Sequence, residues 1–120
     1  MSVYLSNAFS LNMLKVGSEG VHADINFVTP ADIPADAINI IGHPDIATIV
    51  SSILERDIPV NRVTATLCAG DILYVVQYRG PRLPVGATTL PENAKLDFYR
   101  VALWIDGTHL AHRLHSANHR

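Results

Sequence analysis

A histidine between a glycine and a proline is the residue of this sequence best suited to proton transfer. His43 lies in Gly42-His43-Pro44, where one predicted helix ends and the next begins. Free N–H groups and the positive end of the helix dipole favour a phosphate at a helix N-terminus, and a histidine there can exchange a proton with a phosphate ester. The same position suits a histidine that only caps the helix or satisfies a turn, so spacing alone leaves both roles open.

Several polar side chains occur where they could contact a ligand or simply stabilise the fold. Asn7, Ser10 and Asn12 follow the first predicted strand, and they suit either contacts with phosphate, ribose and base edges or ordinary turn hydrogen bonds. Gln77 interrupts an otherwise apolar strand and needs a hydrogen-bond partner, which is either backbone in the core or a ligand at the end of the strand.

Arginine accounts for most of the basic residues, and it is the side chain best shaped for bidentate phosphate recognition. Arg62, Arg79 and Arg82 fall within a stretch that contains a single acid, Asp71. Arg82 lies in a proline-flanked loop, which lowers the entropy lost on binding. A local anion site is therefore compatible with the formal net charge of −2, although each arginine could equally remain solvated.

Metal and covalent chemistry have little support in the sequence. The single cysteine, Cys68, is better explained as a small turn or core residue than as a nucleophile. The motifs of zinc hydrolases, P-loop enzymes and serine hydrolases are absent, and we expect no metal or other cofactor. Histidines crowd the C-terminus at spacings of three and four, where they form either a metal clip or, as we expect, a solvated tail: His109, His112, His115 and His119.

Composition limits the class of protein. A chain of 120 residues with 48% hydrophobic and 17% charged residues is long enough for one domain with a real core, and it is neither disordered nor highly charged. No apolar run could span a bilayer, and the start lacks the features of a signal peptide. The acidic net charge gives no general attraction for DNA. We expect a cytoplasmic protein without DNA or membrane as partners.

Apolar periodicity and turn residues indicate an α/β domain. A short helical turn is expected at residues 11–15, and helices at residues 29–41 and 44–54, the second with Pro44 in its first turn. Alternating or continuous apolar stretches predict five strands, at residues 3–5, 21–28, 63–67, 72–78 and 96–105. The order favours a mixed, mostly antiparallel five-stranded sheet with flanking helices, whose edges could pair with a second copy. Residues 1–106 are predicted to form one domain, and residues 107–120 a His-rich tail.

Five short stretches, in this order, resemble the viral anti-CRISPR ring nuclease family, which also occurs in bacteria, in their phages and in some type III CRISPR loci. They are Tyr4-Leu-Ser-Asn-Ala-Phe-Ser-Leu-Asn-Met-Leu14, Ile41-Gly-His-Pro44, Asn61-Arg-Val63, Gly70-Asp-Ile-Leu-Tyr-Val-Val-Gln77 and Arg79-Gly-Pro-Arg-Leu-Pro84. The resemblance covers about residues 3–104.

The resemblance implies a homodimer that binds cyclic tetra-adenylate, the second messenger of type III CRISPR defence. Family members cleave the ring without metal, by attack of a substrate 2′-hydroxyl, into linear di-adenylate with a 2′,3′-cyclic phosphate. This would switch off the defence in the cytoplasm of a prokaryotic cell, the host cell if the protein is viral. By position in the motifs, the resemblance implies that His43 is catalytic and that the ligand-binding residues are Asn7, Ser10, Asn12, Arg62, Gln77 and Arg82.

One position departs from the family pattern. A glutamate that assists the reaction is expected between Pro84 and Gly86, but this chain has Val85. Valine cannot transfer a proton or hydrogen-bond a 2′-hydroxyl. A non-catalytic protein that only holds the ring is therefore an alternative function, and a plain protein-interaction module is a third.

Overall fold

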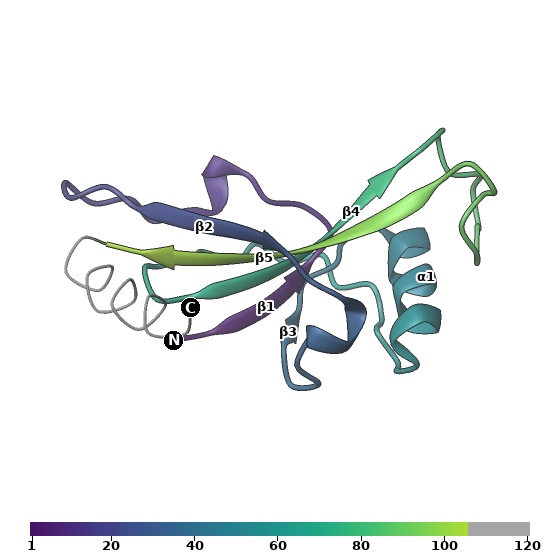
Figure 1. Ribbon diagram of the computed structural model, residues 1–120, viewed down its shortest axis with the longest axis horizontal. Coiled ribbons are helices and arrows are strands. Elements are labelled where there is room, and N and C mark those ends of the chain that lie inside the picture. Colours follow the sequence, from purple (N-terminus) through teal and green to yellow (C-terminus); the bar gives the residue numbers. More distant parts are fainter. Residues whose placement is uncertain (106–120) are drawn as a thin grey trace.

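One five-stranded sheet forms the centre of the computed structural model, which describes residues 1–105 (Figure 1). Its strands lie in the order β2 (His22–Phe27), β5 (Lys95–Trp104), β4 (Ile72–Arg79), β1 (Val3–Ser6) and β3 (Ile38–Asn39). The long ladders, β2 with β5 and β4 with β5, are antiparallel, whereas β1 pairs in parallel with both β4 and β3. The predicted mixed, mostly antiparallel five-stranded sheet is therefore confirmed. The other elements are the 3-10 turns η1 (Leu11–Met13), between β1 and β2, and η2 (Pro30–Asp32), between β2 and β3, and the helix α1 (Pro44–Leu54), between β3 and β4.

The predicted helix over residues 29–41 is wrong beyond its first turn. Thr29 and Asp32 form a helix start, because the Asp32 carboxylate accepts hydrogen bonds from the amide (2.8 Å) and hydroxyl (3.1 Å) of Thr29. The resulting turn, η2, ends at Ile33, which is extended. Pro34 explains the stop, since proline lacks an N–H group and disfavours the helical conformation of the residue before it.

The chain after this stop forms β3, a two-residue edge strand that local pattern did not predict. Ile38 pairs with Tyr4, and the amide of Ile40 donates to the carbonyl of Leu5 at 2.8 Å. These contacts join segments that are far apart in the sequence, and they bring the backbone that precedes α1 to the edge of β1.

The predicted strand over residues 63–67 is also wrong. Val63 is exposed, and residues 63–67 make only one isolated bridge, between Leu67 and Leu14. Leu67 is buried in a core cluster against the sheet. The apolar alternation of this stretch therefore reflects burial of Leu67 and not pairing with another strand. The fifth strand of the sheet is β3 instead.

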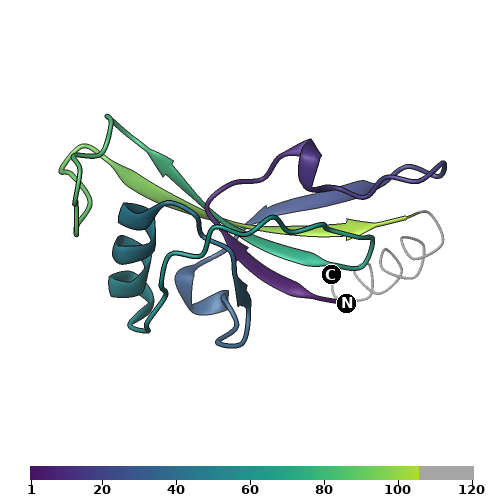
Figure 2. The same ribbon diagram turned by 180° about the vertical axis from the view of Figure 1, so that it is seen from behind.

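Helix α1 packs against one face of the sheet at the end where β4 finishes and β5 begins, as Figure 2 shows from behind. It is the one α-helix within residues 1–105, so among these residues the predicted flanking helices reduce to α1 and the turns η1 and η2. Ile46 and Val50 of α1 pack with Tyr74 and Phe98 of the sheet in one core cluster. A second core cluster lies on the opposite face, where irregular segments replace a helix; we call this the loop-covered face, and its sheet residues are Tyr4, Leu73, Val75, Tyr99, Val101 and Leu103. The predicted tail over residues 107–120 lies outside the described residues.

Edge strand β2 is more exposed than its alternation predicts. Ile25 and Phe27, expected to point into the core, have exposed fractions of 55% and 74%. They pair with Val101 and Tyr99, so they share the loop-covered face, and the rings of Phe27 and Tyr99 are in contact with centroids 4.8 Å apart. The described segments cover only part of this face, which leaves an apolar strip open along β2.

Candidate functional site

An open pocket of about 530 Å³ lies where β1 ends and the chain enters α1. Three segments line it: the loop after β1, the backbone before α1 and residues 62–65. Four of the predicted ligand-binding residues meet there, namely Asn7, Ser10, Asn12 and Arg62. The structure therefore brings Arg62 together with polar residues that lie 50 to 55 positions earlier in the sequence.

Two of the pocket side chains bind the backbone of Gly42. The Asn7 side-chain oxygen accepts a hydrogen bond from the Gly42 amide at 3.1 Å, and Arg62 Nε donates to the Gly42 carbonyl at 2.7 Å. A side chain at position 42 would meet Arg62, because a Cβ there would lie 3.3 Å from its Cγ. Arg62 is thus held by one nitrogen, and its two terminal nitrogens are available to a ligand.

His43 follows Gly42 directly and caps α1. Its Nδ1 accepts a hydrogen bond from the amide of Ile46 at 3.3 Å, which confirms the capping role that the sequence suggested. Because Nδ1 accepts, the proton of the neutral ring lies on Nε2. The side chain is exposed beside the pocket. Its catalytic role stays a prediction.

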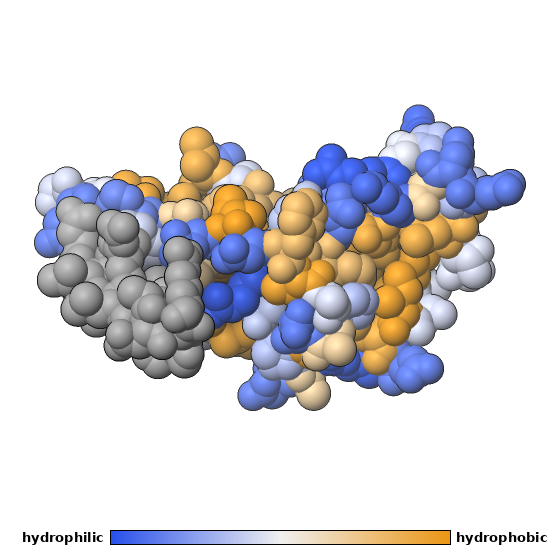
Figure 3. Space-filling model, in the orientation of Figure 1, coloured by the Kyte–Doolittle hydropathy of each residue, from blue (hydrophilic) through white to orange (hydrophobic). Residues whose placement is uncertain are grey.

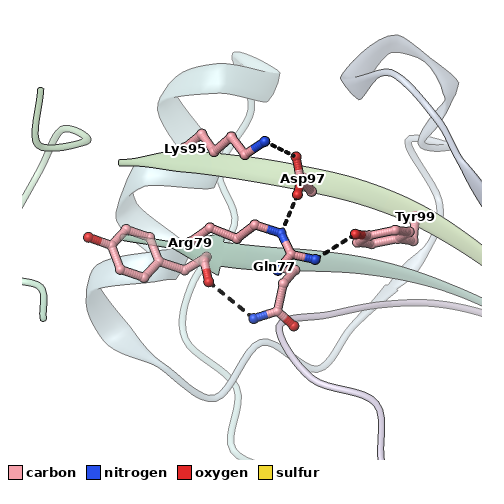
Figure 4. A network of polar contacts seen from close by, with 6 residues as sticks. Gln77, Arg79, Lys95, Asp97 and Tyr99 are labelled. Atoms are coloured by element: carbon pink, nitrogen blue, oxygen red, sulfur yellow. Dashed lines mark hydrogen bonds and ion pairs between the residues drawn. The ribbon is translucent and has the colours of Figure 1, made fainter. Parts of the chain in front are cut away.

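Gln77 lies outside this pocket, and it is an exposed residue of β4 rather than a core amide (Figure 4). Its Nε2 donates to the backbone carbonyl of Tyr78 at 3.1 Å. By the two-residue alternation of a strand it shares a face with Val75, which pairs with Ser6 of β1. Since Ser6 lines the pocket, Gln77 lies farther along the loop-covered face.

A polar network beside Gln77 was not predicted from the sequence (Figure 4). Arg79 hydrogen-bonds to the Asp97 carboxylate and, at 2.8 Å, to the Tyr99 hydroxyl, while Lys95 lies 3.8 Å from Asp97. The hydrogen bonds from Arg79 to Tyr99 and to Asp97 raise the pKa of its guanidinium above the ordinary value. Only the β4–β5 register brings these residues together, and hydrophilic residues gather over this end of the sheet in Figure 3.

Arg82 and Val85 lie in the loop between β4 and β5 and do not line the pocket. Both are exposed, Val85 completely. The residues on either side of Arg82 are anchored, because the Pro81 carbonyl accepts a hydrogen bond from the Tyr78 hydroxyl and Leu83 packs against the helix-side core. The structure thus supports the prediction of a stiff loop at Arg82 but does not bring Arg82 to the other site residues.

The model of the STIV B116-like family matches residues 3–99 of this chain. The chain belongs to the STIV B116-like family. The solved structure of B116 of Sulfolobus turreted icosahedral virus has a similar fold, with a TM-score of 0.67 and 25% sequence identity over 85% of this chain and 99% of that one. No curated protein sequence matches the chain.

The range shared with the STIV B116-like family contains every predicted site residue and the whole pocket, whose lining ends at Ala65. Within residues 1–105, no three His, Cys, Asp or Glu side chains group as they would around a metal ion. In the same residues, every helix is too short or too polar to cross a membrane.

Proposed function

We propose that this protein is a metal-independent ring nuclease that cleaves cyclic tetra-adenylate and thereby switches off type III CRISPR signalling. The observation that carries the proposal is the pocket in which Asn7, Ser10, Asn12 and Arg62 meet beside the Gly42–His43 peptide. These are the residues for which the sequence motifs implied ligand binding and catalysis. The chain belongs to the STIV B116-like family, which is named after a virus protein. This supports the coarser part of the proposal, that the protein is of a viral family.

Arg62 is the cation that would meet a phosphate of the ring. It is exposed, it lines the pocket and it makes no ion pair within residues 1–105. A charge-assisted hydrogen bond from a terminal nitrogen to a phosphate contributes roughly 1.5–3 kcal/mol. The carboxylate of Asp45 lies in the first turn of α1, where its negative charge offsets the positive end of the helix dipole. We therefore assign the phosphate to Arg62 rather than to the N-terminus of α1.

The proposed reaction needs only groups of the substrate and a proton donor. The ribose 2′-oxygen attacks the adjacent phosphorus, the bond from phosphorus to the 5′-oxygen breaks, and a 2′,3′-cyclic phosphate forms. The attacking hydroxyl gives its proton to solvent water. His43, protonated by solvent on both ring nitrogens, would donate its Nε2 proton to the departing 5′-oxygen and become a neutral imidazole. In the doubly protonated form its Nδ1 no longer accepts from the Ile46 amide. Such proton transfer typically accelerates a reaction by ~10²–10⁴-fold. Holding the 2′-oxygen in line with the bond that breaks accelerates the reaction further, because the reacting atoms are already in position.

A homodimer is part of the proposal because the ring has four phosphates and allows two-fold symmetry. Two copies of the pocket would present each arginine twice. The apolar strip at Ile25 and Phe27 supports self-association, since it lies on the loop-covered face and exposes large side chains. Analytical ultracentrifugation of the protein and of a Phe27→Ser variant tests this: we expect a dimer that the substitution weakens, and a monomeric parent protein would contradict it.

A specific observation favours the second candidate, a protein that binds the ring without cutting it. Val85 is fully exposed where the motif resemblance leads us to expect a catalytic glutamate, so position 85 supplies no proton acceptor. Such a protein would lower the concentration of free messenger by binding it in stoichiometric amounts.

Incubation of the protein with labelled cyclic tetra-adenylate in excess EDTA, followed by chromatography, distinguishes the candidates. A ring nuclease yields linear di-adenylate with a cyclic phosphate at an undiminished rate. Retention of intact ring on the protein identifies the binding protein. Cleavage that stops with EDTA and returns with Mn²⁺ or Mg²⁺ contradicts the metal-independent mechanism, and the absence of binding contradicts both candidates.

A further inference from the structure

Asn61 connects Arg62 of the pocket to the backbone that leads into His43. Three carbonyl groups between residues 39 and 42 of that backbone accept hydrogen bonds from two neighbouring residues. The Asn39 carbonyl accepts from Asn61 Nδ2 at 2.8 Å, and the Ile41 carbonyl accepts from the Asn61 amide at 2.7 Å. The Gly42 carbonyl accepts from Arg62 Nε at 2.7 Å. Asn61 and Arg62 therefore clamp the same short strip of backbone.

The segment that carries Arg62 has no regular structure of its own. Residues 57–66 belong to no helix or strand, so ladder hydrogen bonds do not place Arg62. The two hydrogen bonds of Asn61, and the one from Asn39 Nδ2 to the Pro59 carbonyl, tie the segment to β3 and to the backbone between β3 and α1 instead. Removal of the Asn61 side chain would leave the segment with fewer constraints on the side next to the pocket.

We infer that Asn61 is a positioning residue that couples the ligand-binding Arg62 to the catalytic His43. Asn61 does not line the pocket, so it acts through its neighbours and not by touching the ligand. The roles of Arg62 and His43 in this inference rest on the proposed function. The clamp itself is a property of the ligand-free protein and is measured separately.

Two variants remove the side-chain donor of Asn61 without adding charge. Asn61→Leu keeps a side chain that branches at Cγ but has no polar atoms, and Asn61→Ala removes the side chain beyond Cβ. Asn61 is exposed, so both variants should fold, which thermal unfolding checks. Asn93→Ala is the matched control, because Asn93 is an exposed asparagine in the loop before β5.

The first measurement uses ligand-free protein. Hydrogen exchange at the Asn61 backbone amide and at Arg62 Nε, followed by ¹⁵N NMR, reports on the clamp directly. We expect exchange about 10-fold faster in both Asn61 variants and unchanged in Asn93→Ala, because weaker constraints open these bonds more often. Unchanged exchange in the Asn61 variants would overturn the inference. This holds even if Asn61 proves to contact the ring itself, because it would then act on the ligand and not through the clamp.

The second measurement compares ring affinity with the single-turnover rate of cleavage. A residue that places both Arg62 and His43 should affect both quantities, each by about 10-fold or more, since small displacements cost much in rate. Arg62→Ala should mainly weaken binding, and His43→Ala should mainly slow cleavage. Faster exchange with unchanged binding and cleavage overturns the coupling. If the parent protein neither binds nor cleaves the ring, the proposed function fails and the exchange data alone decide whether Asn61 holds the clamp.

Discussion

The side-chain oxygen of Asn7 accepts a hydrogen bond from the Gly42 amide, and this bond ties the end of β1 to the residue before His43. Asn7 thus has a structural role in the ligand-free protein in addition to the ligand contact that its motif implies. The pairing explains why an asparagine in the loop after β1 and a glycine before α1 both belong to one site.

Two substitutions of Asn7 should separate its structural role from its role in binding. Asn7→Ala leaves the Gly42 amide without its acceptor, so we expect a loss of about 1 kcal/mol in the free energy of unfolding. Asn7→Asp keeps the acceptor and should restore most of that stability, yet its negative charge should weaken binding of the anionic ring. Urea denaturation and isothermal titration calorimetry give the two quantities. Equal stability of the two variants would contradict the structural role.

His43 both caps α1 and is the proposed proton donor, and a pair of variants distinguishes these roles. His43→Ala should lower stability by roughly 0.5–2 kcal/mol through the lost cap, and it should slow ring cleavage by orders of magnitude while the ring still binds. His43→Asn restores a capping side chain but no proton donor, so stability should recover without the rate. Recovery of cleavage together with stability would show that His43 acts only as a cap.

Gly42→Ala should weaken ring binding through Arg62. The new Cβ would lie 3.3 Å from Arg62 Cγ, so the arginine side chain must shift by a few tenths of an ångström. We expect ring affinity to fall by about 10-fold, since the guanidinium then approaches the phosphate in a different geometry. The control is Gly17→Ala, because a Cβ at Gly17 meets no atom within 4 Å. Calorimetric titration of both variants with the ring makes the comparison, and equal affinities would exclude this route.

Val85→Glu should raise the rate of cleavage and lower the affinity for the ring. Val85 is fully exposed, so the substitution should not affect folding. If a glutamate here orients the 2′-hydroxyl or accepts its proton, the single-turnover rate should rise by ~10-fold or more. Its charge near four phosphates should weaken binding. Single-turnover cleavage at saturating enzyme is the measurement. A variant no faster than the parent shows that position 85 is not the missing catalytic position.

Local sequence was sufficient for most of the secondary structure. Apolar runs and alternation predicted β1, β2, β4 and β5, and the proline in the first turn with apolar residues at helical spacing predicted α1. These signals extend over only a few residues, so they depend little on the rest of the fold. The loop position of Asn7 and Ser10, and the short helical turn that contains Asn12, followed from the same kind of signal.

Tertiary structure decided the fifth strand and the composition of the site. β3 forms because its two residues meet the edge of β1, whereas residues 63–67 have the alternation of a strand but only one bridge. Arg62 reaches the pocket through contacts that span about twenty positions, and Gln77 lies outside it because its strand continues past Ser6. Pairing between distant segments decides the position of β3, of Arg62 and of Gln77. The free energy of such pairing is not encoded in the local pattern of either segment. The sequence by itself thus determined which residues can bind an anion, and the fold decided which of them lie together.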